Sequence, residues 1–369
     1  PDLFDRTACF LDVGGYLLYR ATGRLLFEWT AASVTGLFNL KTKRWDGLLM
    51  RYFGLPQEKF PPLVRSTEQV GGLTAEAAAD CGLLEGTPVV AGAGDVPTAA
   101  IGSGAIGEGE GHLYLGTSGW VVVMTGRRVT GKRGIASIQS ADPDKLILIA
   151  ETETAGACLQ WIANQFYREE QADPAVENVF ALMDQAVEQV EAGSGYLIFT
   201  PWMYGERSPV ADVYLRSAFI NLSYDHTREQ MLRAVYEGVA YNLRWMVELI
   251  HDLYGFPLSV LRVIGGGARG APWMQIIADV TGRRVEAVAH PQEAGAVGAA
   301  LIAALGLGHY PNFDALKEVV HVTRVFEPRS EHADVYDTLF TAYKQVYRSL
   351  RGLYHRINRE RFAAESPGP

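Results

Sequence analysis

The chain of 369 residues has few cysteines and no long hydrophobic run. Cys9, Cys81 and Cys158 are odd in number and widely spaced, which predicts neither a disulfide framework nor a metal site and favours a reducing, cytoplasmic environment. No apolar stretch approaches the roughly 18 residues that a membrane span needs. The N-terminus lacks the pattern of a signal peptide. We therefore expect no association with a membrane.

An excess of basic residues is also missing. The net charge is −9, so the chain lacks the positive surface that nucleic acid attracts, and we expect no nucleic-acid partner. The eight histidines show no H-x-x-x-H spacing, so no dedicated metal ligands are predicted. Hydrophobic residues make up 48% of the chain, enough for two domains. Strand-like and helix-like segments alternate, which indicates the α/β class.

The first 84 residues have a mainly helical pattern, in which Phe10 joins residues 16–18 in one helix and Trp45 joins residues 48–52 in another. Further strands are expected at 145–150, 196–200, 260–264 and 284–288, and further helices at 74–81, 155–166, 272–280, 293–305 and 331–357. Thr227 and Gln230 form a capping box that starts another long helix. A frayed tail is expected at 366–369.

An acidic residue in a glycine-rich bend is the first candidate site. Val89 and Val90 have the character of a short buried strand, Gly92 and Gly94 permit a tight bend, and Asp95 stands at the end of that strand. Asp95 is either a general base that takes a proton from an attacking hydroxyl or a turn aspartate that accepts nearby N–H groups.

A second turn follows closely. Strand 112–115 breaks at the small residues 116–119 before the apolar run 120–124, which predicts a hairpin. Backbone N–H groups at such a tip, with the hydroxyls of Thr117 and Ser118, can donate to phosphate oxygens. The alternative is an ordinary tight hairpin.

Two glycine patterns compete for interpretation. The turn 265–268 joins a strand to a helix, so it can present N–H groups to an anion, lie under a flat ring, or simply be close-packed. Gly265, Gly267 and Gly270 also fit G-x-G-x-x-G, which would suit an NAD-dependent oxidoreductase.

The loop 201–209 is rich in aromatic and charged residues. Glu206 and Arg207 are expected to form pairs within or beside this loop.

Six segments in order resemble the FGGY carbohydrate kinases, in particular their xylulokinase-like members. These segments are GAGDVPTAAIGSG (92–104), YLGTSG (114–119), TETAGACLQW (152–161), FTPWMYGERSPV (199–210), the helix at 232–245, and VIGGGARGAPWMQIIADVTGRRV (263–285) followed by EAGAVGAALIAA (293–304).

The resemblance implies an actin-like, ribonuclease H-like ATPase fold with ATP, Mg²⁺ and a sugar in the cleft between two domains. Residues 1–92 would be a partial, mostly helical remnant of the N-terminal sugar-binding domain, and 93–369 the C-terminal nucleotide-binding domain. The reaction would be phosphorylation of a sugar or polyol hydroxyl. A xylulose-like pentulose is the favoured substrate. A non-catalytic, kinase-like scaffold is the alternative that is not an enzyme.

The resemblance also assigns roles to individual residues. Asp95 would be the general base, and Gly116 and Thr117, with Ser118 beside them, would form a phosphate hairpin. The remaining nucleotide contacts would be Gly156 and Gln160 near the ribose and phosphates, Gly266 and Gly267 facing adenine, and Ala271 one helical turn on.

The resemblance leaves part of the pattern unmatched. Family members carry a D-x-G-T phosphate loop, with the expected Mg²⁺-site aspartate and most sugar contacts, in a segment that would precede Pro1. Val96 stands where the family usually has a polar residue that touches the sugar. We therefore expect the isolated chain to bind adenine nucleotide weakly without sugar-dependent ADP release. Exposed apolar surface on the incomplete first domain would favour a homodimer.

Overall fold

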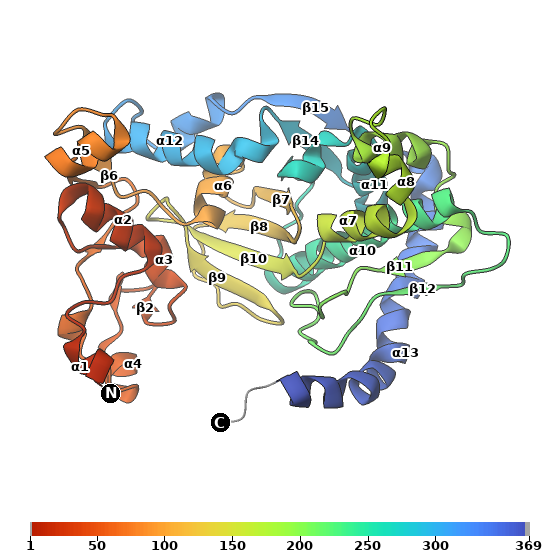
Figure 1. Ribbon diagram of the computed structural model, residues 1–369, viewed down its shortest axis with the longest axis horizontal. Helices are drawn as coiled ribbons and strands as arrows, with labels where there is room; N and C mark the ends of the chain where they lie inside the picture. The colour runs from red at the N-terminus through yellow and green to blue at the C-terminus, as the bar shows by residue number, and fades with distance from the viewer. Residues whose placement is uncertain (1, 366–369) are drawn as a thin grey trace.

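The core of the protein is a mixed sheet of seven strands. The computed structural model describes residues 2–365, so the frayed tail expected at 366–369 lies outside the described residues. The strand order is β15-β14-β13-β7-β8-β10-β9 (Figure 1). The strands are β7 (Gly111–Leu115), β8 (Gly119–Thr125), β9 (Ile135–Gln139), β10 (Leu146–Thr152), β13 (Val260–Ile264), β14 (Arg284–Val288) and β15 (Val322–Phe326).

The sheet combines antiparallel and parallel pairs. β7, β8, β10 and β9 form antiparallel neighbours, whereas β13 runs parallel to both β7 and β14. Short turns join β7 to β8 and β9 to β10, and the parallel half needs helical crossovers. This arrangement confirms the α/β class. It also differs from the mainly parallel sheet that a dinucleotide-binding interpretation of Gly265, Gly267 and Gly270 requires.

Both faces of the sheet are covered by helices, which explains the apolar run in β8. Val121 and Val123 face the large core formed with α7 (Gly156–Phe166), α10 (Arg228–Tyr254) and α11 (Ala271–Thr281). Val122 and Met124 face the opposite side, where α6 (Asp95–Ser103) supplies Ala100. Strands buried on both faces are continuously hydrophobic for this reason.

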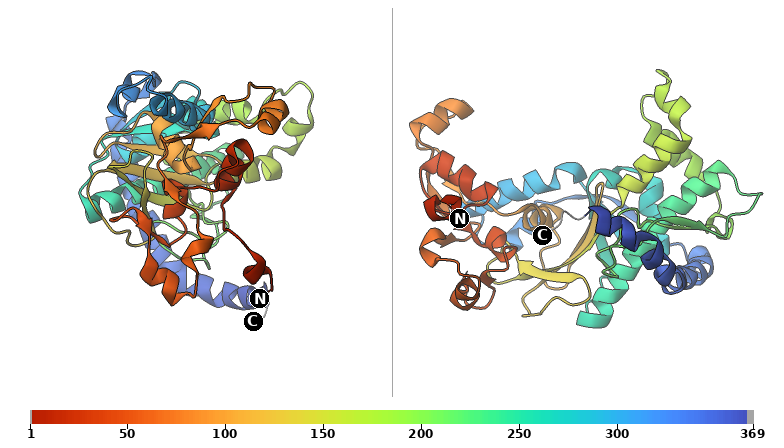
Figure 2. Two further views of the ribbon diagram at one scale, coloured as in Figure 1. Left: turned by 90° about the vertical axis from the view of Figure 1, so that its left-hand side faces the viewer. Right: turned by 60° about the horizontal axis from the view of Figure 1, so that its bottom comes forward.

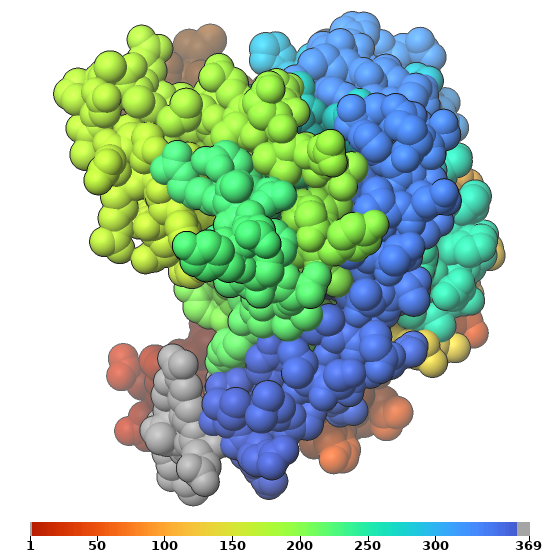
Figure 3. Space-filling model, turned by 90° about the vertical axis from the view of Figure 1, so that its right-hand side faces the viewer, coloured from red at the N-terminus to blue at the C-terminus, as the bar shows by residue number. Residues whose placement is uncertain are grey.

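The remaining C-terminal elements complete these two layers. They are α8 (Arg168–Ala172), α9 (Val179–Glu188), β11 (Ile198–Thr200), β12 (Ala218–Ile220), α12 (Ala294–Gly306) and α13 (Ala333–Glu365), with short 3₁₀ turns η2 (Ser194–Tyr196), η3 (Gly266–Arg269), η4 (Pro291–Glu293), η5 (Asp314–Glu318) and η6 (Ser330–His332). The predicted capping box at the start of α10 is present. Figure 3 shows α13, in blue, extending along one end of the molecule.

Residues 2–92 gather beside the edge of the sheet that β9 forms (Figures 1 and 2). They form α1 (Asp2–Arg6), α2 (Val13–Thr22), β1 (Phe27–Glu28), α3 (Trp29–Ser33), β2 (Phe38–Asn39), β3 (Arg44–Trp45), α4 (Gly47–Tyr52), η1 (Gln57–Lys59), β4 (Leu63–Val64), β5 (Gln69–Gly72), α5 (Ala75–Cys81) and β6 (Pro88–Val90). Two helix boundaries predicted from the sequence are wrong. Phe10 precedes α2, whose N-cap is Asp12, and Trp45 lies in β3, because Asp46 caps α4.

Large apolar side chains remain exposed in this N-terminal part. Examples are Val13 at 78% exposure, Leu48 at 70% and Tyr52 at 82%.

Within residues 2–365, no helix combines the length and apolar character that crossing a membrane requires.

Candidate active site

Asp95 occupies the first position of α6. The preceding Gly94 is the N-cap residue and donates its N–H to the hydroxyl of Thr30 at 2.8 Å. The Asp95 side chain is exposed, and its Oδ1 accepts the N–H of Val96 at 2.8 Å. The sequence placed Asp95 at a strand end; the structure instead separates it from β6 by a bend and starts a helix with it. A carboxylate in a first helical turn is favoured by the helix dipole.

A buried glutamate supports the bend before Asp95. The carboxylate of Glu28 accepts hydrogen bonds from the hydroxyls of Thr30 at 2.5 Å and Ser66 at 2.6 Å. Burial raises the pKa of Glu28 despite these bonds. Thr30 in turn holds the N–H of Gly94, so the Glu28 network fixes the backbone leading to Asp95. No local pattern marks Glu28 in the sequence, because its partners depend on tertiary contacts rather than on spacing.

The predicted hairpin joins β7 to β8. The Gly116 N–H donates to the carbonyl of Ser118 at 3.0 Å and closes the turn. Among the described residues, the N–H groups and hydroxyls of Thr117 and Ser118 form no hydrogen bond. These donors are available to an anion, as a phosphate-binding turn requires.

The start of α7 is fastened to the back of this hairpin. The carbonyl of Gly116 accepts the N–H of Gly156 at 2.8 Å, and that of Thr117 accepts the N–H of Ala155 at 2.8 Å. A Cβ on Gly156 would lie 2.5 Å from the Gly116 carbonyl oxygen, so only glycine permits this approach. Gln160 lies one turn along α7, is exposed, and donates to Asn164 at 2.9 Å.

The third glycine turn leads from β13 into η3 and α11. Gly265 has φ +89°, and a Cβ on Gly267 would lie 2.7 Å from the Trp273 ring, so both positions require glycine. Gly266 is exposed. Because β13 pairs with β7, with Ile264 opposite Tyr114, this turn and the 116–119 hairpin emerge from the same end of the sheet.

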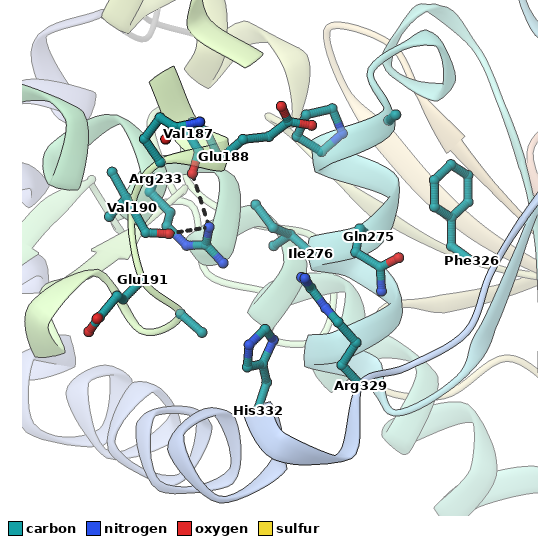
Figure 4. Close-up of a pocket in the computed structure, with 14 residues that line it drawn as sticks. Val187, Glu188, Val190, Glu191, Arg233, Gln275, Ile276, Phe326, Arg329 and His332 are labelled. Atoms are coloured by element: carbon teal, nitrogen blue, oxygen red, sulfur yellow. Dashed lines mark hydrogen bonds between the residues drawn. The ribbon is translucent and has the colours of Figure 1, made fainter. Parts of the chain in front are cut away.

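A cavity of about 480 Å³ adjoins the start of α11. Ala271 lies on its wall, but Asp95, Thr117 and Gly156 do not. Figure 4 shows Arg329 and His332 on one side and the chain around Glu188 on the other. Burial alone would raise the pKa of Asp279, but hydrogen bonds from Arg329 and His332 outweigh it and hold that pKa below its usual value. The Arg329 guanidinium beside the cavity is therefore partly neutralised by Asp279.

The prediction for Glu206 and Arg207 is confirmed only in part. Arg207 pairs with Glu151 at 2.9 Å and Glu153 at 2.5 Å, which lie beside the loop. Glu206 forms no ion pair within the described residues. Its buried carboxylate accepts from Thr152 at 2.7 Å and Asn242 at 2.9 Å, and burial raises its pKa to about 8.

A phosphate-binding turn raises the question of which side chains could hold Mg²⁺ beside it. Mg²⁺ favours oxygen ligands and typically keeps one or two carboxylates together with substrate phosphates. In the part of the chain that the structure describes, no group of three or more Asp, Glu, His or Cys side chains could hold a metal ion. A Mg²⁺ ion bound by the described residues would therefore need phosphate oxygens of the nucleotide among its ligands.

Comparison with known proteins gives the family. The model of the FGGY family of carbohydrate kinases, C-terminal domain, matches residues 111–307, and that of the N-terminal domain matches residues 1–102. The xylulose kinase of Bacillus subtilis is 32% identical over 355 residues, covering 96% of this chain and 69% of that protein. The gluconokinase of the same organism is 27% identical over 350 residues, covering 94% of this chain and 68% of that protein.

Solved structures agree on the fold. The structure of xylulose kinase from Rhodospirillum rubrum is similar with a TM-score of 0.85 and 28% identity, covering 96% of this chain and 70% of that one. That of the Lactobacillus acidophilus enzyme has a TM-score of 0.87 at 24% identity, covering 96% and 71%. The predicted actin-like, ribonuclease H-like fold is thereby confirmed. The chain belongs to the FGGY family of carbohydrate kinases, ATP-using enzymes that phosphorylate a sugar hydroxyl.

Proposed function

We propose that the chain carries the general base and the nucleotide site of a kinase that phosphorylates a xylulose-like pentulose. One packing contact carries the proposal. Val96, next to Asp95, and Trp120, just after the 116–119 hairpin, pack against the same apolar cluster between α6 and the sheet. This shared packing supports a single site that contains the Asp95 carboxylate and the N–H donors of the hairpin.

In the proposed reaction, Asp95 accepts the proton of the sugar hydroxyl while its oxygen attacks the terminal phosphorus of ATP. The bond from that phosphorus to the ADP oxygen breaks, and ADP leaves. The N–H groups of Thr117 and Ser118, next to Gly116, donate to phosphate oxygens. Phosphoryl transfer depends chiefly on such positioning and charge stabilisation. Mg²⁺ is expected with the nucleotide, but no residue is assigned to it.

The other glycine turns supply the proposed nucleotide site. Gly156 and Gln160 would lie beside the ribose and phosphates, since α7 starts at the back of the hairpin. Gly266 and Gly267 would face adenine, with Ala271 beside them at the start of α11. The shared end of β7 and β13 supports one continuous nucleotide path across these turns.

The names of the relatives support a pentulose substrate, because the Bacillus subtilis and Rhodospirillum rubrum proteins are xylulose kinases. The gluconokinases among the relatives make gluconate the second substrate to test. We further propose residues 1–92 as part of the sugar-binding domain and 93–369 as the nucleotide-binding domain.

Two experiments test the proposal. The 369-residue chain should bind ATP weakly, more tightly than NADH, and release no ADP on addition of xylulose. A general base contributes about 10²- to 10⁴-fold in rate, well short of the 10⁶-fold or more that enzymes typically reach. Robust turnover by the chain alone would contradict this part, and preferential NADH binding would favour an oxidoreductase.

The second experiment supplies the chain with the N-terminal segment of the Bacillus subtilis xylulose kinase. We expect xylulose-dependent ADP release in this hybrid, and its loss in Asp95→Asn and Asp95→Ala with ATP binding retained. Turnover that survives both substitutions would rule out Asp95 as the base. No turnover from any hybrid that binds ATP would favour the scaffold alternative.

A further inference from the structure

Arg207 is placed at the hairpin end of the sheet by the loop between β11 and β12. Its guanidinium lies between two carboxylates, with Nη1 2.9 Å from Glu151 and Nε 2.5 Å from Glu153. The Arg207 side chain is 59% exposed. In Figure 1 the loop runs back from β11 beneath the end of β10, and the Ser208 N–H donates to the Glu151 carbonyl at 2.9 Å.

The backbone that carries Arg207 is held rigidly. The neighbouring Glu206 is 2% exposed, and its carboxylate accepts the Arg207 N–H at 2.9 Å and the Glu153 N–H at 3.2 Å. Asn242 of α10 donates to the same carboxylate at 2.9 Å. The Cα of Arg207 is therefore fixed, while its long side chain extends into solvent and can change partners.

Strand register places this arginine close to the proposed phosphate turn. Glu151 is opposite Trp120 and Thr152 is opposite Gly119. Glu153 therefore follows at the level of Ser118, and adjacent strands lie about 5 Å apart. Paired residues in a sheet point to the same face, so Glu151 extends on the same face as Trp120, whose ring packs against the cluster that also receives Val96.

The charges around Arg207 suggest an exchange of partners. Two carboxylates and one guanidinium leave a net charge of −1, so an incoming phosphate meets repulsion unless the arginine turns toward it. A guanidinium binds phosphate oxygens through two parallel hydrogen bonds, a geometry that phosphate and carboxylate share.

We propose that Arg207 leaves Glu151 and Glu153 when substrates bind and donates to the phosphoryl group in transfer, either as the terminal phosphate of ATP or as the phosphate of the sugar product. This inference rests on the proposed function, because it requires phosphoryl transfer at the 116–119 hairpin. Arg207 then stabilises the charge of the phosphoryl group that the hairpin positions, while Asp95 accepts the proton of the sugar hydroxyl.

Equilibrium binding of ATP, AMP and xylulose 5-phosphate to the 369-residue chain tests the exchange without requiring turnover. We expect Arg207→Met to weaken binding of ATP, of the sugar phosphate or of both by about tenfold or more, as loss of a charged hydrogen bond does. Binding of AMP should not change. Arg284→Met is the matched control, because Arg284 also lies between two glutamates, Glu286 and Glu327, but on β14.

Removing one of the two competing carboxylates should act in the opposite direction. Glu153→Gln leaves Arg207 paired with Glu151 and makes its surroundings less negative, so we expect it to strengthen ATP or sugar phosphate binding several-fold, whereas a merely structural ion pair would give no gain. The role of Arg207 would be overturned, with the proposed function left intact, by either of two results. One is unchanged affinity of Arg207→Met for ATP and for the sugar phosphate, and the other is a loss of AMP binding as large as the loss of ATP binding. If the unsubstituted chain binds neither ATP nor AMP, the proposed function fails and the inference fails with it.

Discussion

Gly102 of α6 and Gly298 of α12 face each other where the two helices pack backbone against backbone. A Cβ on Gly102 would lie 1.8 Å from the carbonyl oxygen of Ala294, and one on Gly298 would lie 1.8 Å from that of Thr98. Neither position has space for a methyl group. Because α6 begins at Asp95, this contact sets the position of the proposed base relative to the sheet.

Adding a methyl group at this contact should displace α6. We expect Gly298→Ala to lower the free energy of unfolding by about 1–3 kcal/mol, the usual range for overpacking. Gly295→Ala in the same helix is the control, because its nearest neighbour would be the Thr98 hydroxyl at 3.9 Å. Urea denaturation of the two variants measures the difference. Equal stability in both would show that α6 and α12 separate without cost.

A methyl group at Gly156 tests the contact between α7 and the hairpin. Its Cβ would lie 2.5 Å from the Gly116 carbonyl oxygen, so Gly156→Ala should push the hairpin away from α7. We expect ATP affinity to fall severalfold while most stability remains. Calorimetric titration with ATP measures the loss. Gly126→Ala, at the opposite end of β8 with its nearest neighbour at 3.6 Å, should bind ATP like the unsubstituted chain.

The buried carboxyl of Glu206 should make the free energy of unfolding fall as the pH rises from about 4.5 to about 8. Its pKa is about 8 in the folded protein because of burial, against an ordinary value of 4.5. Between these values the folded state holds a proton that the unfolded state releases, so stability falls as pH rises, by at most about 1.4 kcal/mol per pH unit.

Urea denaturation between pH 5 and pH 8 should therefore show a steeper decline for the natural chain than for Glu206→Gln, which cannot titrate. The exposed Glu76 provides the control, because Glu76→Gln should keep the slope. An identical slope in the Glu206 variant would mean that this carboxyl ionises normally.

The buried imidazole of His112 should make stability depend on pH in the acid range. Burial lowers its pKa to about 3, and its Nε2 accepts the indole N–H of Trp120 at 3.1 Å. Below about pH 6.5 the imidazole is protonated in the unfolded state but stays neutral in the folded state. The free energy of unfolding therefore falls as the pH falls from about 6.5 toward 3. His112→Gln keeps an acceptor for Trp120 and should flatten the acid limb of thermal unfolding. The exposed His309 gives the comparison, since His309→Gln should leave that limb unchanged.

Much of the fold could be predicted because its signals are local. Thr227 and Gln230 form the capping box at the start of α10, and the small residues 116–119 do join β7 to β8. The helix at α5 starts after Thr74 and ends at Gly82, because a threonine cap and a left-handed glycine act within a few residues. Trp45 was misplaced because Asp46 caps the next helix, a choice that the apolar spacing alone does not reveal.

In the candidate site, too, some features follow from local sequence patterns and others only from tertiary contacts. The sequence by itself determined the family, the long helices of residues 93–369 and the glycine turns, since these follow from short patterns. Only the tertiary structure decided that Glu28 supports the bend before Asp95 and that Arg207 pairs with Glu151 and Glu153. Arg207 and Glu153 are separated by 54 positions in the chain, and their contact exists because the end of β10 and a distant loop meet at the hairpin end of the sheet. Such contacts depend on strand register and packing, which no local pattern of residues encodes.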